Sequence, residues 1–214
     1  MKINDNKPSV RLVMVRHAQT EWNLVGKLQG WRDSRLTIEG RKQLACLIST
    51  SQCCRKYPAD IVYSSDLGRA LASARIICNE SGGHIVPDQR LRERRFGILE
   101  GKQKNECVDG FLHTQHWLAY QSRYEKRLDA YDTIATGLLA ESELMFERRV
   151  ADFLQTLVSR HAGKTVYVVS HGEWIRCAWN IVNGRVSWSY GEGIPVNTAM
   201  KIFELMPSQL NLSE

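Results

Sequence analysis

The sequence has few of the features that mark secreted, membrane-spanning or nucleic-acid-binding proteins. Residues 1–9 are polar and contain no apolar core of the kind that a signal peptide needs. No stretch of the 214 residues approaches the length of an apolar membrane span. The formal net charge is +6, but lysine and arginine are spread along the chain and form no basic run. We therefore expect a small anionic partner, and neither nucleic acid nor a membrane.

The six cysteines form no Cys-X-X-Cys motif, and two of them are adjacent, which suits a disulfide poorly. Such a pattern is typical of a reducing compartment, where thiols stay free and pack as small apolar side chains. We therefore expect a cytoplasmic protein whose cysteines have no redox role. The cysteines are Cys46, Cys53, Cys54, Cys78, Cys107 and Cys177.

The chain also has no internal repeat, no low-complexity tract and no linker rich in proline, glycine or serine. Its length suits one domain with a buried core, so we expect a single domain over residues 1–214, with a poorly ordered tail at about 206–214. The sequence maps no surface, and both a monomer and a homodimer remain open.

What the chain does have is an alternation of strand-like and helix-like segments. Short β-branched runs predict strands at 10–15, 60–64, 84–86 and 165–170, and 200–205 is expected to be a final edge strand. Helices are predicted to begin at a Thr37 cap and at a Ser65 or Asp66 cap, and to cover 142–160 and 173–182. In the helix 142–160, Leu144 and Phe146 are expected to face the core. The alternation predicts an α/β fold, a three-layer α/β/α sandwich with a mostly parallel central sheet.

Two of the predicted strands end on a histidine. His17 follows Arg16 after the strand 10–15, and His171 follows the strand 165–170. Ligands of parallel sheets bind beyond the carboxyl ends of the strands. Arg69 lies just after a third strand, at a helix start, where an anion is also favoured. We therefore expect these four side chains to meet in one crevice.

That set of residues suits phosphoryl transfer. A neutral imidazole can attack phosphorus and form a phosphohistidine, provided that its other nitrogen keeps a proton by donating to a carbonyl. The guanidinium groups of Arg16 and Arg69 match phosphate oxygens, and His171 can stabilise the charge of the transition state. The leaving oxygen needs a general acid, for which the segment 91–101 offers Glu93 and Glu100. A phosphate dianion raises the pKa of such a carboxyl group and the flanking arginines lower it, so the sequence leaves the outcome open.

Between about residues 10 and 182 the chain resembles the histidine phosphatase superfamily, also called the phosphoglycerate mutase-like family. A lone Arg-His pair is a weak signal, but so many blocks in the family's order are highly specific. The matching residues are Arg16-His17, Thr20, Asn23, Gln29-Gly30, Asp33, Leu36-Thr37, Gly40, Ser64-Ser65-Asp66-Leu67, Arg69-Ala70, Leu91, Glu93, Phe96-Gly97, Glu100-Gly101, Glu141-Ser142 and Val169-Ser170-His171-Gly172.

The resemblance implies a phosphoglycerate mutase-like fold with a small helical cap inserted at about 102–141. It implies a small anionic phosphorylated substrate, and neither a metal nor another cofactor. It also implies that His17 is the phosphorylated nucleophile and Glu93 the proton donor, with His171 as the third catalytic residue. The phosphate-binding residues that it implies are Arg16, Arg69, Asn23, Thr20, Gln29 and Gly172.

The chain departs from the family pattern at two places. Ala18 stands where a glycine usually follows Arg-His, and alanine tolerates a positive φ less well. Glu173 and Trp174 follow the second histidine motif, where many members have small residues. A carboxylate and a large ring there are expected to narrow the pocket or to repel some anions.

Other conspicuous residues have ordinary explanations. We expect structural or surface roles for His84 and His161, and for His113 and His116, since no third metal ligand accompanies this pair. The run of Arg92, Arg94 and Arg95 is expected to be solvated. The aromatic residues Trp117, Tyr120 and Tyr124 are expected to pack a cap helix.

Two activities share the phosphohistidine, because either water or a substrate hydroxyl can take the phosphoryl group. The block Glu93-Arg94-Arg95-Phe96-Gly97 resembles the mutase signature, and Lys104 falls where mutases place a substrate lysine. Mutases, however, have a tyrosine at the position of Phe96 and a longer insertion with an arginine pair. We therefore expect a phosphatase, with a mutase as the alternative and a non-catalytic phosphate-binding module as a third reading. Arg123, Lys126 and Arg127 in the cap are candidates for binding a second anionic group.

Overall fold

The computed structural model describes residues 8–103, 140–187 and 193–210, which are built around one five-stranded sheet. The strand order is β3-β2-β4-β1-β5, with β1 to β4 parallel and β5 antiparallel to β1 at the edge. The mostly parallel sheet and the edge position of its last strand are as the sequence predicts, and the structure adds that this strand is antiparallel. The strands are β1 (Val10–Arg16), β2 (Ile61–Ser64), β3 (Ile85–Pro87), β4 (Thr165–Ser170) and β5 (Met200–Leu205).

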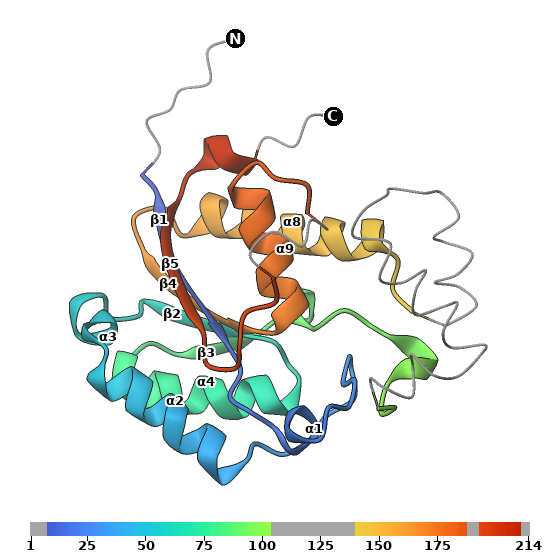
Figure 1. Cartoon of the computed structure of the whole chain (residues 1–214). Coiled ribbons are helices and arrows are strands. Elements are labelled where there is room, and N and C mark those ends of the chain that lie inside the picture. The colour runs from blue at the N-terminus through green and yellow to red at the C-terminus, as the bar shows by residue number, and fades with distance from the viewer. Residues whose placement is uncertain (1–7, 104–139, 188–192, 211–214) are drawn as a thin grey trace.

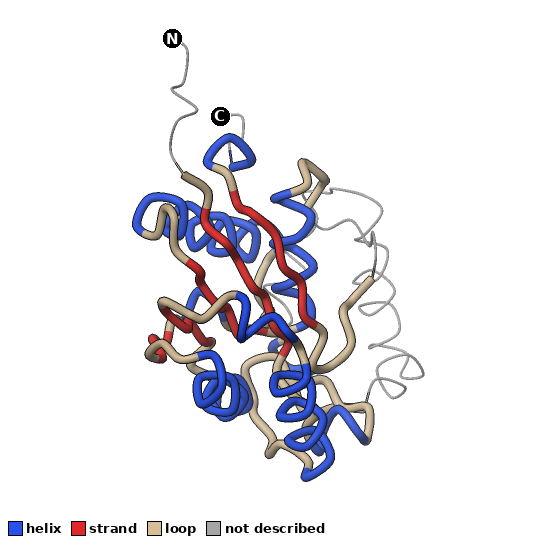
Figure 2. Tube along the Cα trace, turned by 90° about the vertical axis from the view of Figure 1, so that its left-hand side faces the viewer, coloured by secondary structure: helices blue, strands red, loops and turns tan. Residues whose placement is uncertain are grey.

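Helices cover both faces of the sheet and complete the predicted three layers (Figure 1). One face carries α2 (Ile38–Thr50), α3 (Gln52–Lys56) and α4 (Gly68–Ser81), and the other carries α8 (Glu143–Arg160) and α9 (Gly172–Val182). Figure 2 shows the strands between these helices from the side. The short elements are α1 (Glu21–Leu24) and the 3-10 turns Gln89–Leu91, Gly97–Leu99 and Pro207–Leu210.

The central strands bury both of their faces. In β1, Leu12 and Met14 pack with α8 and α9, whereas Val13 and Val15 pack with α2 and α4. Because successive strand residues point to opposite sides, an apolar residue is needed at every position of a sheet that is covered twice. This explains why the central strands are continuous apolar runs in the sequence.

The helix starts are predicted correctly at one place and wrongly at another. Thr37 caps α2, and its hydroxyl accepts from the Gly40 amide at 2.9 Å. Neither Ser65 nor Asp66 caps α4, whose N-cap is Leu67. The Ser65 hydroxyl instead accepts from the Leu67 amide at 3.3 Å, and the Asp66 carboxylate pairs with Arg92. Both side chains are engaged before the helix begins.

One predicted core position of α8 is wrong. Leu144 is 41% exposed, whereas Phe146 and the residues that follow it at helical spacing are buried. Two residues along a helix correspond to a rotation of about 200°, so Leu144 and Phe146 cannot share a face. The start of this helix is as predicted, with Ser142 accepting from the Met145 amide at 3.2 Å.

Several predictions fall on residues outside the described ranges. These include the cap helix with its aromatic and basic residues, Lys104, Cys107, and the pair His113 and His116. Within the expected tail, residues 207–210 form a 3-10 turn, and Leu210 packs against the core. Among the described helices, none combines the length and the apolar character that crossing a bilayer requires.

Candidate active site

The two strands that end on histidine are neighbours in the sheet. β1 and β4 run parallel with Arg16 opposite Ser170, and the His17 amide donates to the Ser170 carbonyl at 2.9 Å. Parallel strands in register end at the same edge, so His17 and His171 meet there with ring centroids 5.1 Å apart. Both rings are buried. The sheet topology therefore brings the two predicted histidines together.

His17 has one defined tautomer. Its Nδ1 lies 2.8 Å from the Ala18 carbonyl oxygen. A carbonyl can only accept, so Nδ1 carries the proton and Nε2 keeps its lone pair. Burial lowers the pKa of His17 well below its ordinary value, and the positive charges of Arg69 and Arg16 lower it further. His17 is therefore a neutral imidazole with a free electron pair on Nε2, as a nucleophile requires.

His171 is neutral for the same reasons. Burial lowers its pKa well below the ordinary value, with further contributions from Arg69, His17 and Arg16. Within the described residues, neither of its ring nitrogens has a hydrogen-bond partner. Leaving a buried polar group unpaired costs about 1–3 kcal/mol. An oxygen of a bound phosphate would satisfy such a nitrogen.

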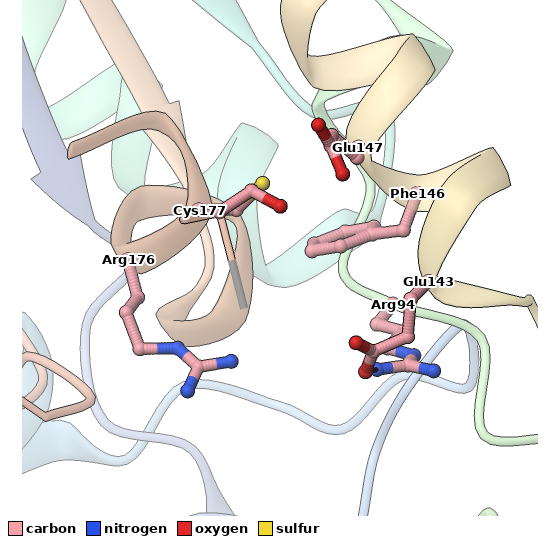
Figure 3. Close-up of a pocket in the computed structure, with 7 residues that line it drawn as sticks. Arg94, Glu143, Phe146, Glu147, Arg176 and Cys177 are labelled. Carbon is pink, nitrogen blue, oxygen red and sulfur yellow. Dashed lines mark hydrogen bonds and ion pairs between the residues drawn. The ribbon is translucent and has the colours of Figure 1, made fainter. Parts of the chain in front are cut away.

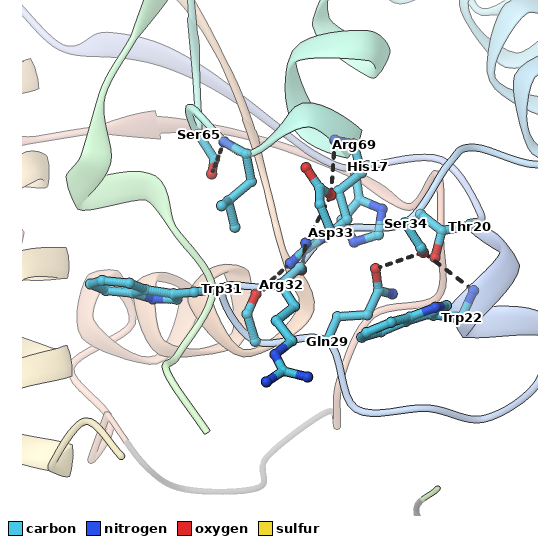
Figure 4. Close-up of polar contacts among 12 residues, drawn as sticks. His17, Thr20, Trp22, Gln29, Trp31, Arg32, Asp33, Ser34, Ser65 and Arg69 are labelled. Atoms are coloured by element: carbon cyan, nitrogen blue, oxygen red, sulfur yellow. Dashed lines mark hydrogen bonds and ion pairs between the residues drawn. The ribbon is translucent and has the colours of Figure 1, made fainter. Parts of the chain in front are cut away.

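Two buried arginines flank the histidines. Arg69, the second residue of α4, donates to the Gly30 and Arg32 carbonyls, both at 2.7 Å, and pairs with Asp33 at 3.1 Å. Figure 4 shows how the segment 29–34 wraps this guanidinium beside His17. Arg16 donates to the Pro195 carbonyl. The Nε of each arginine is buried without a partner among the described residues, so each retains a donor for an anion.

Glu93 is a buried carboxyl group at the same edge. One carboxylate oxygen accepts from the Arg94 amide at 3.0 Å and the other from the Glu173 amide at 3.3 Å, two residues after His171. Burial raises its pKa, and the charge of Glu173 raises it further, against the lowering effects of the Arg94 amide, Arg16 and Arg69. Burial and the charge of Glu173, which the sequence does not reveal, therefore outweigh the two arginines and raise the pKa of Glu93 above its ordinary value. Glu93 stays protonated to a higher pH than an ordinary glutamate.

Glu100, the other candidate acid, holds two loops together. Its Oε1 accepts from the Phe96 amide at 2.9 Å and from the Trp31 amide at 3.1 Å. Glu93 is the carboxyl group that lies beside the helix N-terminus carrying His171, so it is the better placed of the two.

Of the three arginines around Glu93, Arg95 is exposed as expected, but Arg94 is buried and Arg92 is half-buried, so the prediction of a solvated run is wrong for these two. Arg94 is 2% exposed and pairs with Glu143, while Arg92 pairs with Asp66 and stacks over Trp31 at 4.7 Å. Buried cations need such partners because an unpaired buried charge is strongly destabilising. The charges of Arg92 and Arg94 are thus paired with Asp66 and Glu143, and the arginines whose charges lower the pKa of Glu93 are Arg16 and Arg69.

A small pocket lies between α8 and α9, beside Arg94. Arg94, Glu143 and Phe146 line one side, and Arg176 and Cys177 line the other (Figure 3). Its volume is about 10 Å³, which is room for about one water molecule. It separates the Arg94–Glu143 pair from the Arg176–Glu173 pair rather than holding a substrate.

The expectation that Trp174 narrows the pocket is wrong. Trp174 is fully buried, packs edge-on against Phe153 and donates to the Arg90 carbonyl at 2.8 Å. One step along α9 rotates a side chain by about 100°, which turns Trp174 into the core while Glu173 stays beside Glu93. Of the two neighbours Glu173 and Trp174, only Glu173 is therefore part of the site.

The other predicted phosphate-binding residues have structural contacts. Thr20 caps α1, and its hydroxyl donates to Asn23 Oδ1 at 3.0 Å and accepts from the Asn23 amide at 3.2 Å. Gln29 accepts from Ser34 at 3.2 Å. At Gly172, an added Cβ would lie 3.3 Å from Arg16 Cζ and 2.5 Å from Ile194 Cγ2, so only glycine fits beside the arginine. The phosphate-binding roles of these residues remain predictions.

Sequence reasoning missed a support for the nucleophile. The Asn197 amide group donates to the His17 carbonyl at 3.1 Å and to Asn23 Oδ1 at 3.2 Å. The following residue, Thr198, has a φ of 65°, which marks a tight turn into β5. Nothing in the local pattern around Asn197 indicates a partner 180 residues away.

Ala18 fits its position without strain. It is not among the described residues with positive φ, and its amide donates to the Ser73 hydroxyl at 3.0 Å. Alanine therefore replaces the usual glycine without the expected conformational cost.

The described residues include no group of three or more histidine, cysteine, aspartate or glutamate side chains arranged to hold a metal ion. His161 is structural, as expected, since its Nε2 lies 3.0 Å from the Tyr63 hydroxyl.

Comparisons with known proteins agree with this geometry. The sequence model of the histidine phosphatase superfamily (branch 1) matches residues 12–213. Phosphoserine phosphatase 1 of Hydrogenobacter thermophilus is 31% identical over 186 residues, which are 85% of this chain and 82% of that protein. Probable phosphoglycerate mutase GpmB of Serratia proteamaculans is 30% identical over 178 residues, 82% of this chain and 75% of that protein.

Solved structures share the fold. Bacillus stearothermophilus YhfR superposes with a TM-score of 0.73 at 26% identity, covering 90% of both chains. A phosphoserine phosphatase from Entamoeba histolytica, in complex with phosphoserine, gives a TM-score of 0.72 at 28% identity, covering 91% of this chain and 90% of that one.

Replacing Glu173 by glutamine is expected to lower the pKa of Glu93. The substitution removes a negative charge that disfavours the Glu93 carboxylate, and it leaves the Glu173 backbone amide in place. Carbon-detected NMR titration of the Glu93 carboxyl group in both proteins measures the difference. Glu147→Gln is the matched control, since Glu147 lies on α8 where its charge acts on Cys177. An unchanged or higher pKa in the Glu173 variant would contradict the assignment.

Proposed function

The chain belongs to branch 1 of the histidine phosphatase superfamily, and on that basis we propose that it is a phosphomonoesterase acting through a phosphohistidine on His17. Its substrate is a small phosphorylated metabolite. The observation that carries the proposal is the state of His17, whose Nδ1 proton is held by the Ala18 carbonyl while Nε2 is free.

In the first step, Nε2 of His17 forms a bond to phosphorus as the bond from phosphorus to the leaving oxygen breaks. The proton of Glu93 passes to the leaving oxygen, so the alcohol departs neutral. Arg16, Arg69 and His171 hydrogen-bond the phosphoryl oxygens, and their fixed positions avoid reorganisation as charge develops.

In the second step, water attacks phosphorus and the bond to Nε2 breaks. The Glu93 carboxylate takes the proton of the water, which restores the starting state of both residues. Charge neutralisation is assigned to Arg16 and Arg69, neutral His171 contributes a hydrogen bond, and the proposal includes no metal or cofactor.

The alternative is a mutase, in which a substrate hydroxyl replaces that water. The relatives include proteins named for each activity. We favour the phosphatase because Phe96 is a buried phenylalanine where mutases have a tyrosine, and because Glu100-Gly101 follows the phosphatase pattern.

We also propose a cytoplasmic location, which the thiols support. The described cysteines are free, and Cys53, Cys54 and Cys177 are buried. Burial raises the pKa of Cys53, which makes it a poor thiolate and argues for packing rather than redox chemistry.

Replacing His17 by alanine is expected to lower the turnover of an aryl phosphate by at least about a thousandfold, because no other group supplies the nucleophile. The assay is run in excess EDTA. Wild-type protein quenched during turnover should carry acid-labile, base-stable phosphate on His17. His161→Ala is the control and should retain full activity, since its imidazole contacts Tyr63. Turnover by the His17 variant near the wild-type rate would overturn the proposal. Loss of the wild-type activity in EDTA would also overturn it.

A screen of phosphorylated metabolites is expected to give free phosphate without isomer formation. It includes phosphoserine, 3-phosphoglycerate and fructose 2,6-bisphosphate, and it measures both phosphate and isomer for each compound. Isomer formation faster than phosphate release would replace the phosphatase by the mutase.

Replacing Glu93 by glutamine is expected to lower kcat by about a hundredfold or more for an alkyl phosphate, and by no more than about threefold for an activated aryl phosphate. The poor leaving group needs a proton, whereas the activated phenolate does not. Glu100→Gln is the comparison, and the same selectivity in that variant alone would assign the acid to Glu100.

A further inference from the structure

The Glu141-Ser142 block has a contact that the proposed mechanism does not use. Ser142 caps α8, but the side chain of Glu141 turns to Arg149, two turns along the same helix. Glu141 Oε1 accepts from Arg149 Nε at 2.6 Å and Oε2 accepts from Nη2 at 2.8 Å. This two-point ion pair is mostly buried, with side-chain exposures of 9% and 15%.

The remaining donors of Arg149 bind the backbone of residues 90–93, in the loop that carries Glu93, the proposed general acid. Nη1 donates to the Arg90 carbonyl at 2.9 Å and to the Arg92 carbonyl at 2.6 Å, and Nη2 donates to the Glu93 carbonyl at 2.9 Å. A guanidinium has five N–H donors. All five are used here by protein acceptors, so Arg149 has none left for a substrate.

Glu141 binds the same loop from its other side. Its amide donates to the Arg95 carbonyl at 3.0 Å, and its Oε2 accepts from the Arg95 amide at 3.3 Å. Its carbonyl accepts from Nε and Nη2 of Arg94, both at 3.2 Å. The pair therefore contacts every residue from Arg92 to Arg95, the segment that carries Glu93.

We propose that Glu141 and Arg149 form a positioning pair that fixes the backbone at Glu93 and so aims its carboxyl group at the leaving oxygen. The inference rests on the proposed role of Glu93 as the general acid. The Glu93 carbonyl also accepts from the Trp31 indole at 2.8 Å, so Arg149 is one of two donors holding that peptide. Proton transfer in the transition state depends on heavy-atom separations of about 2.6–3.2 Å, so a small displacement of this backbone is costly to catalysis.

The test compares Arg149→Lys with wild-type protein on an alkyl phosphate and on an activated aryl phosphate. Lysine keeps the charge but has three donors on one nitrogen, so it cannot hold three carbonyls and a carboxylate together. We expect kcat for the alkyl phosphate to fall by at least about tenfold, with the aryl phosphate within about threefold. Glu141→Gln, which removes the ion pair from the other side, should show the same selectivity. Arg148→Lys, an exposed arginine on the same helix, is the matched control and should change neither rate.

The aryl phosphate is also the internal measure of folding, because a damaged protein loses activity toward both substrates. Equal losses on the two substrates, or no loss, would overturn the positioning role. In a Glu93→Gln background, Arg149→Lys should add less than about a twofold loss, since residues acting through one group are not additive. A full additional loss would also overturn it.

The same set of variants separates the two proposals. If Glu93→Gln itself shows no preference for the good leaving group, the assignment of the acid fails and not the positioning pair alone. If Glu93→Gln shows that preference and neither Arg149→Lys nor Glu141→Gln does, only the positioning role fails.

Discussion

The backbone hydrogen bond from the His17 amide to the Ser170 carbonyl ends the ladder between β1 and β4, and the site depends on this pairing. It sets two parallel strands in register, so that His17 and His171 leave the sheet at the same height. A shift of the register by one residue would turn one imidazole to the opposite face. Such a shift would also exchange the side chains that pack in the two buried clusters, and a change of side-chain volume in a close-packed core is costly.

Burial at this edge has opposite effects on the two kinds of titratable group. It lowers the pKa of His17 and His171 and raises the pKa of Glu93, because the charged form is disfavoured in each case. The result is a neutral imidazole beside a carboxyl group that keeps its proton to a higher pH than usual, and both shifts favour the states that a nucleophile and a general acid need. The neighbouring arginines reinforce the first effect and oppose the second, and Glu173 offsets part of that opposition.

The supports of these groups come from distant parts of the chain. The segment 29–34 holds Arg69, Asn197 holds the carbonyl of His17, and Arg149 with Glu141 holds the backbone of Glu93. Each support includes hydrogen bonds to backbone carbonyls. The Glu141–Arg149 ion pair also has two contact points, and two points fix orientation better than one. These contacts fix the donors of the site before any ligand arrives, which is the preorganisation that the proposed phosphoryl transfer requires.

By itself the sequence determined the layers, the parallel strands and the residues at their carboxyl ends, because apolar periodicity and strand endings are local properties. It also determined the Thr37 cap and the need for a fixed tautomer at His17. Only the tertiary structure decided that Arg94 is buried, that Trp174 belongs to the core and that burial outweighs the arginines at Glu93. It also decided that Asn197 donates to the His17 carbonyl and that Arg149 donates to the Glu93 carbonyl. Burial and these contacts join residues that are far apart in the chain, so their effects exist only once the layers have packed.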